Sequence, residues 1–174
     1  MKKHLIIIIL ILITFIFQSC IISQKPNVSF FDDPSYNYGT ARFTSINVPM
    51  FLAKPIVKKS LRSEAENEEL IKLIKKVSEV KVMTIENSNV EMVSDFAKYL
   101  KNEQYEEWMT VKKETETVNF QAKQKGDEIR KLMISISSGS ELVLVNISGK
   151  FTADDISRLI NYSEKNDLYK KVLH

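Results

Sequence analysis

The sequence predicts an α+β fold, a mixed, mainly antiparallel five-stranded sheet with helices packed on one face. Two patterns predict it. Apolar residues recur at helical spacing across residues 47–77 and 88–100, and they alternate with polar residues in short runs from residue 105 to residue 148. Because the links between those runs are short, neighbouring strands must be antiparallel. The expected element order is α-α-β-α-β-β-β-β-α.

Two helices are expected in residues 47–77. Asn47 is a suitable N-cap, and Pro49 falls in the first turn, where its missing N–H costs nothing. Residues 63–66 have the spacing of a capping box, which opens a second helix ending at Val77.

The next elements are a strand at residues 80–85 and a third helix. Ser88 and Glu91 are spaced as a capping box at its start. The apolar residues of this helix fall on one face, which predicts that this face is buried: Met92, Val93, Phe96, Ala97 and Leu100.

Four strands and a final helix complete the domain. Turn-forming residues separate the strands, so they form a meander, and the third and fourth are continuously apolar and are expected at its centre. Thr152 is the expected cap of the last helix, and residues 163–174 form a polar tail. Residues 47–162 are therefore expected to be a single α+β domain, with strands at residues 105–113, 117–124, 129–137 and 141–148.

Residues 1–19 have the layout of a secretory signal peptide. Two lysines precede an apolar core from Leu5 to Phe17, shorter than the roughly 20 apolar residues of a membrane-spanning helix. The alternative is an uncleaved anchor, because reading on to Ile22 lengthens the apolar run. Residues 20–46, punctuated by proline and glycine, predict a tether.

The only cysteine, Cys20, ends the stretch FQSC at the close of this leader. FQSC resembles the lipobox of bacterial lipoproteins, in which the cysteine thiol receives a diacylglycerol and a peptidase cuts before it. The resemblance implies that acyl chains on Cys20 hold the mature chain on a membrane, since two or three chains anchor stably. A buried free cysteine is the alternative. No acidic run follows Cys20, and among such lipoproteins this favours the cell envelope's outer membrane, facing the periplasm.

The charge argues against nucleic acid as a partner. The formal net charge is +3, and it falls to +1 once Lys2 and Lys3 leave with the leader. Charges of both signs are interspersed, so the chain has no broad positive field. The expected partners are the membrane, through the N-terminal lipid, and an envelope protein of unknown identity.

Several stretches of the predicted domain resemble a known family. They are FLAKPIVKKSL, YEEWMTVK, QAKQKGDEIRKLMI and NISGKFTADDISRLI. In this order they are similar to the domain of unknown function DUF4252, found in small lipoproteins of Gram-negative envelopes. The resemblance implies one domain over residues 47–162 and supports the lipid anchor. It implies no catalytic or binding residues, because none is established for that family.

The sequence lacks the residues of common catalytic and metal sites. The two histidines are His4, in the leader, and His174, so neither a nucleophile–histidine arrangement nor a zinc site is expected. Asp154 and Asp155 are expected to offset the dipole of the last helix rather than to bind a ligand. We expect no catalytic residue, no metal ion and no cofactor.

A binding surface is the remaining candidate for function. Asn119, Gln121 and Lys123 share the polar face of an alternating strand. Trp108 lies either in the core or at the surface, where it would mark a contact site. These four residues are the expected interaction surface of a non-catalytic binding module. The alternatives are a regulatory lipoprotein in envelope-stress signalling and a glycan-acting enzyme with paired carboxylates.

Overall fold

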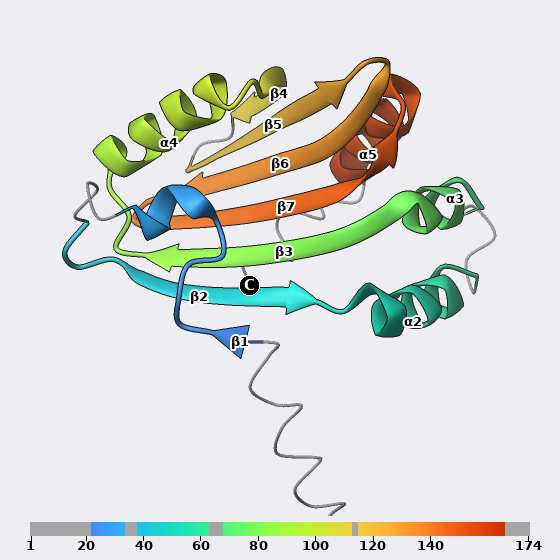
Figure 1. Ribbon diagram of the computed structural model, residues 1–174, viewed down its shortest axis with the longest axis horizontal. Helices are drawn as coiled ribbons and strands as arrows, with labels where there is room; N and C mark the ends of the chain where they lie inside the picture. The colour runs from blue at the N-terminus through green and yellow to red at the C-terminus, as the bar shows by residue number, and fades with distance from the viewer. Residues whose placement is uncertain (1–21, 34–37, 63–67, 113–114, 166–174) are drawn as a thin grey trace, which may run out of the picture.

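The computed structural model describes residues 22–33, 38–62, 68–112 and 115–165 (Figure 1). The expected leader, Cys20 and the capping box at residues 63–66 lie outside these ranges. The described elements are the strands β1 (Ile22–Ser23), β2 (Arg42–Val48), β3 (Val77–Glu86), β4 (Glu106–Lys112), β5 (Glu116–Lys125), β6 (Glu128–Ser138) and β7 (Glu141–Phe151), the α-helices α2 (Met50–Arg62), α3 (Glu68–Lys76), α4 (Val90–Asn102) and α5 (Ala153–Lys165), and the 3₁₀ helix η1 (Ser29–Asp32).

The seven strands form one sheet in the order β1-β2-β3-β7-β6-β5-β4. Every neighbouring pair is antiparallel. The α+β class is confirmed, but the prediction of five strands in a mixed sheet is wrong. The two additional strands, β1 and β2, come mainly from the stretch expected to be a tether, where β2 pairs with β3 along its whole length. The prediction of Asn47 as a helix cap is wrong, because Asn47 lies in β2 and is paired with Lys81. Interspersed Thr, Ser and Asn residues hide this strand, because its apolar residues do not alternate regularly.

The middle of the sheet is as expected. β7 is the central strand and β6 lies beside it, because both are apolar over long runs and are covered on both faces. The alternation of directions makes β3 and β4 point the same way, with three strands between them. α4 connects them across one face of the sheet (Figure 1).

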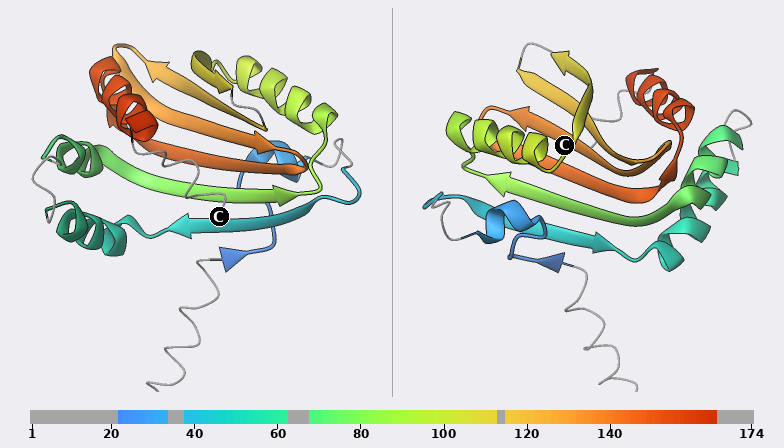
Figure 2. Two further views of the ribbon diagram at one scale, coloured as in Figure 1. Left: turned by 180° about the vertical axis from the view of Figure 1, so that it is seen from behind. Right: turned by 45° about the horizontal axis from the view of Figure 1, so that its top comes forward.

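Helices pack on both faces of the sheet, which corrects the prediction of a single covered face (Figure 2). On the face that we call the α4 face, Met83 and Leu144 pack with α4 and η1. On the opposite face, the α5 face, Val143 packs with α3 and α5. The reason is visible in β7, where the run Leu142–Val145 is apolar at every position and presents apolar side chains to both sides.

The segment before β2 is held on the domain by aromatic side chains. Phe30 and Phe31 of η1 are buried, and each ring centroid lies 5.5 Å from that of Phe96 in α4. Phe31 also contacts Phe43 of β2, again at 5.5 Å. These contacts and the pairing of β1 with β2 make residues 22–33 part of the domain.

Helix ends differ from the predictions in detail. The N-cap of α4 is Asn89, whose side chain accepts a hydrogen bond of 2.8 Å from the N–H of Met92, whereas Ser88 is buried before it. α5 continues to Lys165, three residues beyond the expected domain end.

Among the described residues, no helix combines the length and the hydropathy that spanning a membrane requires.

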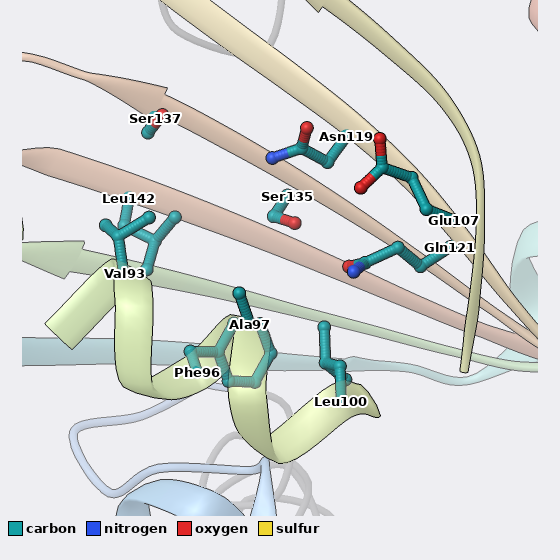
Figure 3. Close-up of a pocket in the computed structure, with 10 residues that line it drawn as sticks. All are labelled: Val93, Phe96, Ala97, Leu100, Glu107, Asn119, Gln121, Ser135, Ser137 and Leu142. Atoms are coloured by element: carbon teal, nitrogen blue, oxygen red, sulfur yellow. The ribbon is translucent and has the colours of Figure 1, made fainter. Parts of the chain in front are cut away.

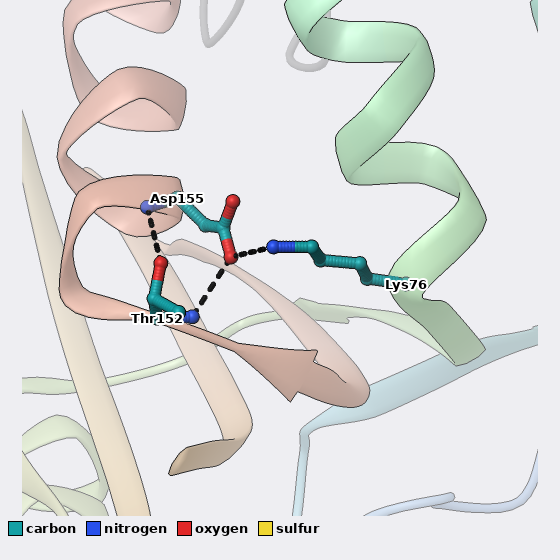
Figure 4. Close-up of polar contacts among 3 residues, drawn as sticks. All are labelled: Lys76, Thr152 and Asp155. Atoms are coloured by element: carbon teal, nitrogen blue, oxygen red, sulfur yellow. Dashed lines mark hydrogen bonds and ion pairs between the residues drawn. The ribbon is translucent and has the colours of Figure 1, made fainter. Parts of the chain in front are cut away.

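Thr152 caps α5, as predicted, and does so reciprocally with Asp155 (Figure 4). The N–H of Thr152 donates to Asp155 Oδ2 at 2.8 Å, and the N–H of Asp155 donates to Thr152 Oγ1 at 3.3 Å. Lys76, the last residue of α3, donates to the same Oδ2 atom and so ties α3 to α5. Burial raises the pKa of Asp155, but the bonds from Lys76 and Thr152 and the charge of Lys76 outweigh it, so this pKa lies below its usual value.

Candidate functional site

The candidate site lies on the α4 face, beside the helix. Asn119, Gln121 and Lys123 of β5 point to this face, while the alternate residues of β5 enter the core of the α5 face. α4 covers the part of this face formed by β3 and β7, so a polar stripe remains uncovered along its flank. The cross-strand partners that extend this stripe onto β6 are, in the same order, Ser135, Met133 and Lys131.

The first of two hollows in this stripe is a cavity of about 60 Å³, which we call the amide pocket (Figure 3). One wall is apolar and comes from α4. The facing wall comes from the sheet and presents carboxylate, amide and hydroxyl groups. The cavity has room for a few water molecules or one small polar group. Its lining residues are Val93, Phe96, Ala97, Leu100, Glu107, Asn119, Gln121, Ser135, Ser137 and Leu142.

Thr110 connects two of the polar groups of the amide pocket. Its Oγ1 lies 2.7 Å from Glu107 Oε1 and 2.7 Å from Asn119 Oδ1. A hydroxyl has one proton, so it can donate to only one of them. Both contacts are satisfied when Thr110 donates to the Glu107 carboxylate and the Asn119 amide turns to donate through Nδ2. The Asn119 oxygen then becomes available to a ligand.

The second hollow, of about 260 Å³, adjoins the amide pocket at Leu100, which lines both. We call it the lysine pocket. Its volume is close to the lower end of the range for small-molecule sites, so it suits a ligand of about the size of one sugar. The lining residues come from four strands, the end of α4, the connection from α4 to β4, and the start of η1 with the two residues before it: Asn27, Val28, Ser29, Lys81, Tyr99, Leu100, Glu103, Tyr105, Lys123, Lys131, Met133 and Asn146.

Three lysines converge on the lysine pocket. Lys123 and Lys131 are directly opposite each other on β5 and β6, and Lys81 enters from β3. Like charges in this cross-strand position destabilise a sheet by roughly 0.2–1 kcal/mol. Lys123 Nζ lies 3.2 Å from Glu103 Oε2, and Lys81 Nζ lies 3.2 Å from Glu79 Oε1. Within the described residues Lys131 forms no ion pair, so the pocket keeps uncompensated positive charge.

Hydrogen-bonding groups surround these charges. Burial, together with the negative charges that Tyr99 and Glu103 can carry, raises the pKa of Tyr105 to about 12, so its phenol stays protonated and can donate. The Oδ1 atoms of Asn27 and Asn146 are buried and have no hydrogen-bond partner within the described residues. Buried polar atoms are normally paired. The pocket therefore offers positive charge, a phenol donor and two unused acceptors.

The structure brings three of the predicted surface residues together and separates the fourth. Asn119 and Gln121 line the amide pocket, and Lys123 lines the lysine pocket. Trp108 instead packs against the core of the α5 face. A bulge between Glu107 and Met109 interrupts the alternation of β4 and turns Trp108 away from the face of Thr110.

Sequence reasoning missed Lys81, Lys131, Tyr105 and Asn146. Lys131 had a usable signal, because it has the same parity along β6 as Ser135 and Ser137, which are polar residues. Lys81 and Asn146 are opposite each other on β3 and β7, and this pairing joins segments distant in the chain. No local pattern predicts it.

Metal and acid-pair chemistry find little support at these pockets. No cluster of three or more His, Cys, Asp or Glu residues suited to a metal ion occurs in the described ranges. Each pocket contains one carboxylate, Glu107 in one and Glu103 in the other. Cleavage of a glycosidic bond by the usual mechanism needs two.

Comparison with known proteins identifies a family but no functional relative. No curated protein and no solved structure matches the chain. A family model described as a domain of unknown function, DUF4252, matches residues 36–159. This range includes every element from β2 to β7 and the start of α5, and so the residues of α4 and of the sheet that line the two pockets. The chain therefore belongs to the DUF4252 family.

Proposed function

We propose that this protein is a lipid-anchored binding module of the cell envelope, and that its lysine pocket takes a small polar ligand carrying a carboxylate or phosphate group. The observation that carries the proposal is the pair of lysines facing each other across β5 and β6 with Lys81 beside them. Lys123 and Lys81 have carboxylate partners, whereas Lys131 has none among the described residues. An oxyanion bound between Lys123 and Lys131 would replace their repulsion with charge-assisted hydrogen bonds.

The neighbouring groups suit the rest of such a ligand. The buried oxygens of Asn27 and Asn146 accept hydrogen bonds, so they favour a ligand with hydroxyl or amine donors beside its anionic group. The amide pocket continues the polar surface beyond Leu100 through Asn119 and Gln121. A hydroxylated acid, such as an acidic sugar, combines the donors and the anionic group. The proposed role is binding without catalysis, because each pocket holds a single carboxylate.

Calorimetric titration tests the ligand chemistry. Inorganic phosphate and glucuronate are the anionic probes, and glucose is the neutral counterpart of glucuronate. We expect at least one of the two anions to bind and glucose not to bind. Lys131→Gln should weaken anion binding about 10–100-fold, since a hydrogen bond to a charged group contributes roughly 1.5–3 kcal/mol. Lys125→Gln is the matched control, because Lys125 is an exposed lysine of the same hairpin that lines neither pocket.

Two results of this titration would contradict the proposal. One is binding of neither anion by the wild type. The other is equal weakening by Lys131→Gln and Lys125→Gln, which would indicate a general effect of surface charge rather than a site. Affinity should also fall as salt is added, because the attraction is electrostatic.

The anchor is a separate part of the proposal and has its own test. We propose that Cys20 carries the lipid and that the protein faces the periplasm from the outer membrane. The support is the leader and the FQSC stretch. Mass spectrometry of the purified protein should find an acylated N-terminal cysteine, and Cys20→Ser should move the protein out of the membrane fraction. An unmodified thiol, or a Cys20→Ser variant still in the membranes, would refute the anchor without affecting the pocket.

A further inference from the structure

One edge of the molecule leaves large apolar side chains in contact with solvent. In α2, Phe51 is 77% exposed, Leu52 is 52% exposed and Ile56 is 69% exposed, and Ile22 of β1 is 61% exposed. Phe96 of α4 and Ile156 of α5 are buried by contrast, and the remaining large apolar residue exposed in the described helices is Val90, at the start of α4. Exposed apolar residues that gather on one element commonly mark an interaction surface.

β1 and α2 belong to the same border of the fold. Ile22 is paired with Ile46 of β2, and β2 ends at Val48, two residues before α2 begins. At about 3.3 Å per residue, α2 starts roughly 13 Å along the chain from the partner of Ile22. Figures 1 and 2 show β1, β2 and α2 together along one border, whereas β4 is the strand at the opposite edge of the sheet and α4 lies on one face.

The charge of α2 fits an anionic surface. The helix contains Lys54, Lys58, Lys59 and Arg62 and no acidic residue. A helix with exposed apolar residues and only basic charges is typical of segments that lie in the interface of a bilayer. Basic residues at such a surface each add roughly 1 kcal/mol of attraction to anionic lipids.

We propose that α2 and β1 form a membrane-facing surface that docks the domain on an anionic lipid bilayer. This inference rests on the proposed anchor, which supplies its geometry. Cys20 precedes Ile22 by two residues, a reach of at most about 7 Å. Acyl chains on Cys20 therefore hold the β1 edge at the bilayer, where Phe51 and Ile56 insert among the headgroups and the lysines of α2 meet lipid phosphates.

The docked surface gives the domain an orientation. A flexible tether of about 26 residues would let the domain tumble, whereas a two-residue connection to β1 with a second contact through α2 fixes it. The opposite edge of the sheet, which β4 forms, then faces away from the bilayer (Figure 1). The amide pocket, which Glu107 of β4 and Asn119 and Gln121 of β5 line, lies toward that edge and so on the side of the aqueous compartment.

Vesicle binding by the unacylated mature chain tests this surface independently of the lipid. The protein is the chain from residue 20 with Cys20→Ser, which contains every described element. It is floated with vesicles of phosphatidylglycerol or of phosphatidylcholine. We expect binding to the anionic vesicles, at least tenfold weaker binding for Phe51→Gln/Ile56→Gln, and about fivefold weaker binding for each lysine replaced in Lys58→Gln/Lys59→Gln. Val90→Gln is the control, because Val90 is 86% exposed but begins α4, which is not part of the proposed surface.

A fluorescence version of the vesicle experiment tests which part of the protein contacts the bilayer. Cys20→Ser removes the only cysteine, so Phe51→Cys or Val90→Cys introduces a unique labelling position for a polarity-sensitive dye. On anionic vesicles the dye at position 51 should shift to the blue and the dye at position 90 should not. Equal shifts at both positions, or loss of binding in neither α2 variant, would overturn the proposal.

Two further outcomes distinguish membrane docking through α2 from dimerisation and from the proposed lipid anchor. If the unacylated chain binds no vesicle but forms dimers that Phe51→Gln/Ile56→Gln disrupts, the surface joins two copies of the chain and the membrane proposal is wrong. If it binds anionic vesicles while the protein from cells lacks acyl groups, the α2 surface stands and the anchor at Cys20 fails.

Discussion

The cap of α5 offers the most quantitative test of the fold, because its parts can be removed one at a time. In Asp155→Asn the side chain keeps an oxygen for the Thr152 N–H and loses the charge that faces Lys76. The change from a charged to a neutral acceptor costs about 1 kcal/mol, taken at the low end because the Lys76 side chain is partly exposed and screened. Asp155→Ala also removes the cap and costs about 1 kcal/mol more.

The pH dependence follows from the lowered pKa of Asp155. A carboxyl whose pKa is lower in the folded state stabilises the protein above its unfolded pKa, about 3.9, and this stabilisation is lost as pH falls through the folded pKa. The difference in the free energy of unfolding between wild type and Asp155→Asn should therefore be constant from neutral pH to about pH 5 and should narrow below about pH 4. For Asp155→Ala, the part of the stability loss that comes from the missing helix cap should persist at low pH.

Thermal unfolding followed by circular dichroism measures these differences. For a chain of this length, 1 kcal/mol corresponds to about 2–4 °C in Tm. Asp154→Asn is the control, because Asp154 lies in the same first turn, is exposed and makes no ion pair among the described residues. Asp155 does not have this role if Asp154→Asn lowers Tm as much as Asp155→Asn, or if the stability difference between wild type and Asp155→Asn widens in acid.

Two further substitutions test the packing. In Gly149→Ala the new Cβ would clash with the ring of Phe151 and would lie 2.7 Å from the backbone oxygen of Lys76, so overpacking should destabilise the protein by about 1–3 kcal/mol; a variant as stable as the wild type in urea denaturation would refute this contact. Ser45 is 1% exposed and its Oγ has no partner within the described residues, so Ser45→Ala should be neutral or stabilising by up to about 1 kcal/mol; a clear loss of stability in the same assay would show that the hydroxyl is satisfied.

The fold was predictable where one period dominates a segment. The stripe from Met92 to Leu100 and the alternation in β5 each persist over several repeats, so the helix and the strand follow from local sequence. β2 was not predictable in this way, because its pairing with β3 depends on contacts that only the folded chain makes. The continuous apolar run of β7 predicts a central strand, and it also predicts that helices cover both faces of the sheet there, because apolar side chains point to both sides.

The candidate site was predictable only in part, for related reasons. Alternation alone places Asn119, Gln121 and Lys123 on one face, and it does so correctly. The same rule fails for Trp108, because a bulge changes the parity of β4 between Glu107 and Met109. Lys81 joins Lys123 and Lys131 through the strand order, in which a distant strand, β3, is brought next to β7.

In the proposed function Lys131 lowers the stability of the free protein and binds an anion, and one measurement tests both properties. Thermal unfolding of the wild type and of Lys131→Gln is compared with and without saturating inorganic phosphate at constant ionic strength. Without phosphate, Lys131→Gln should be the more stable protein by roughly 0.2–1 kcal/mol, because repulsion from Lys123 is removed. With phosphate, the order should reverse, since the wild type binds phosphate more tightly, by about 10–100-fold, and so gains more binding energy than the variant. A variant that is less stable without phosphate and responds to phosphate as the wild type does would contradict this role of Lys131.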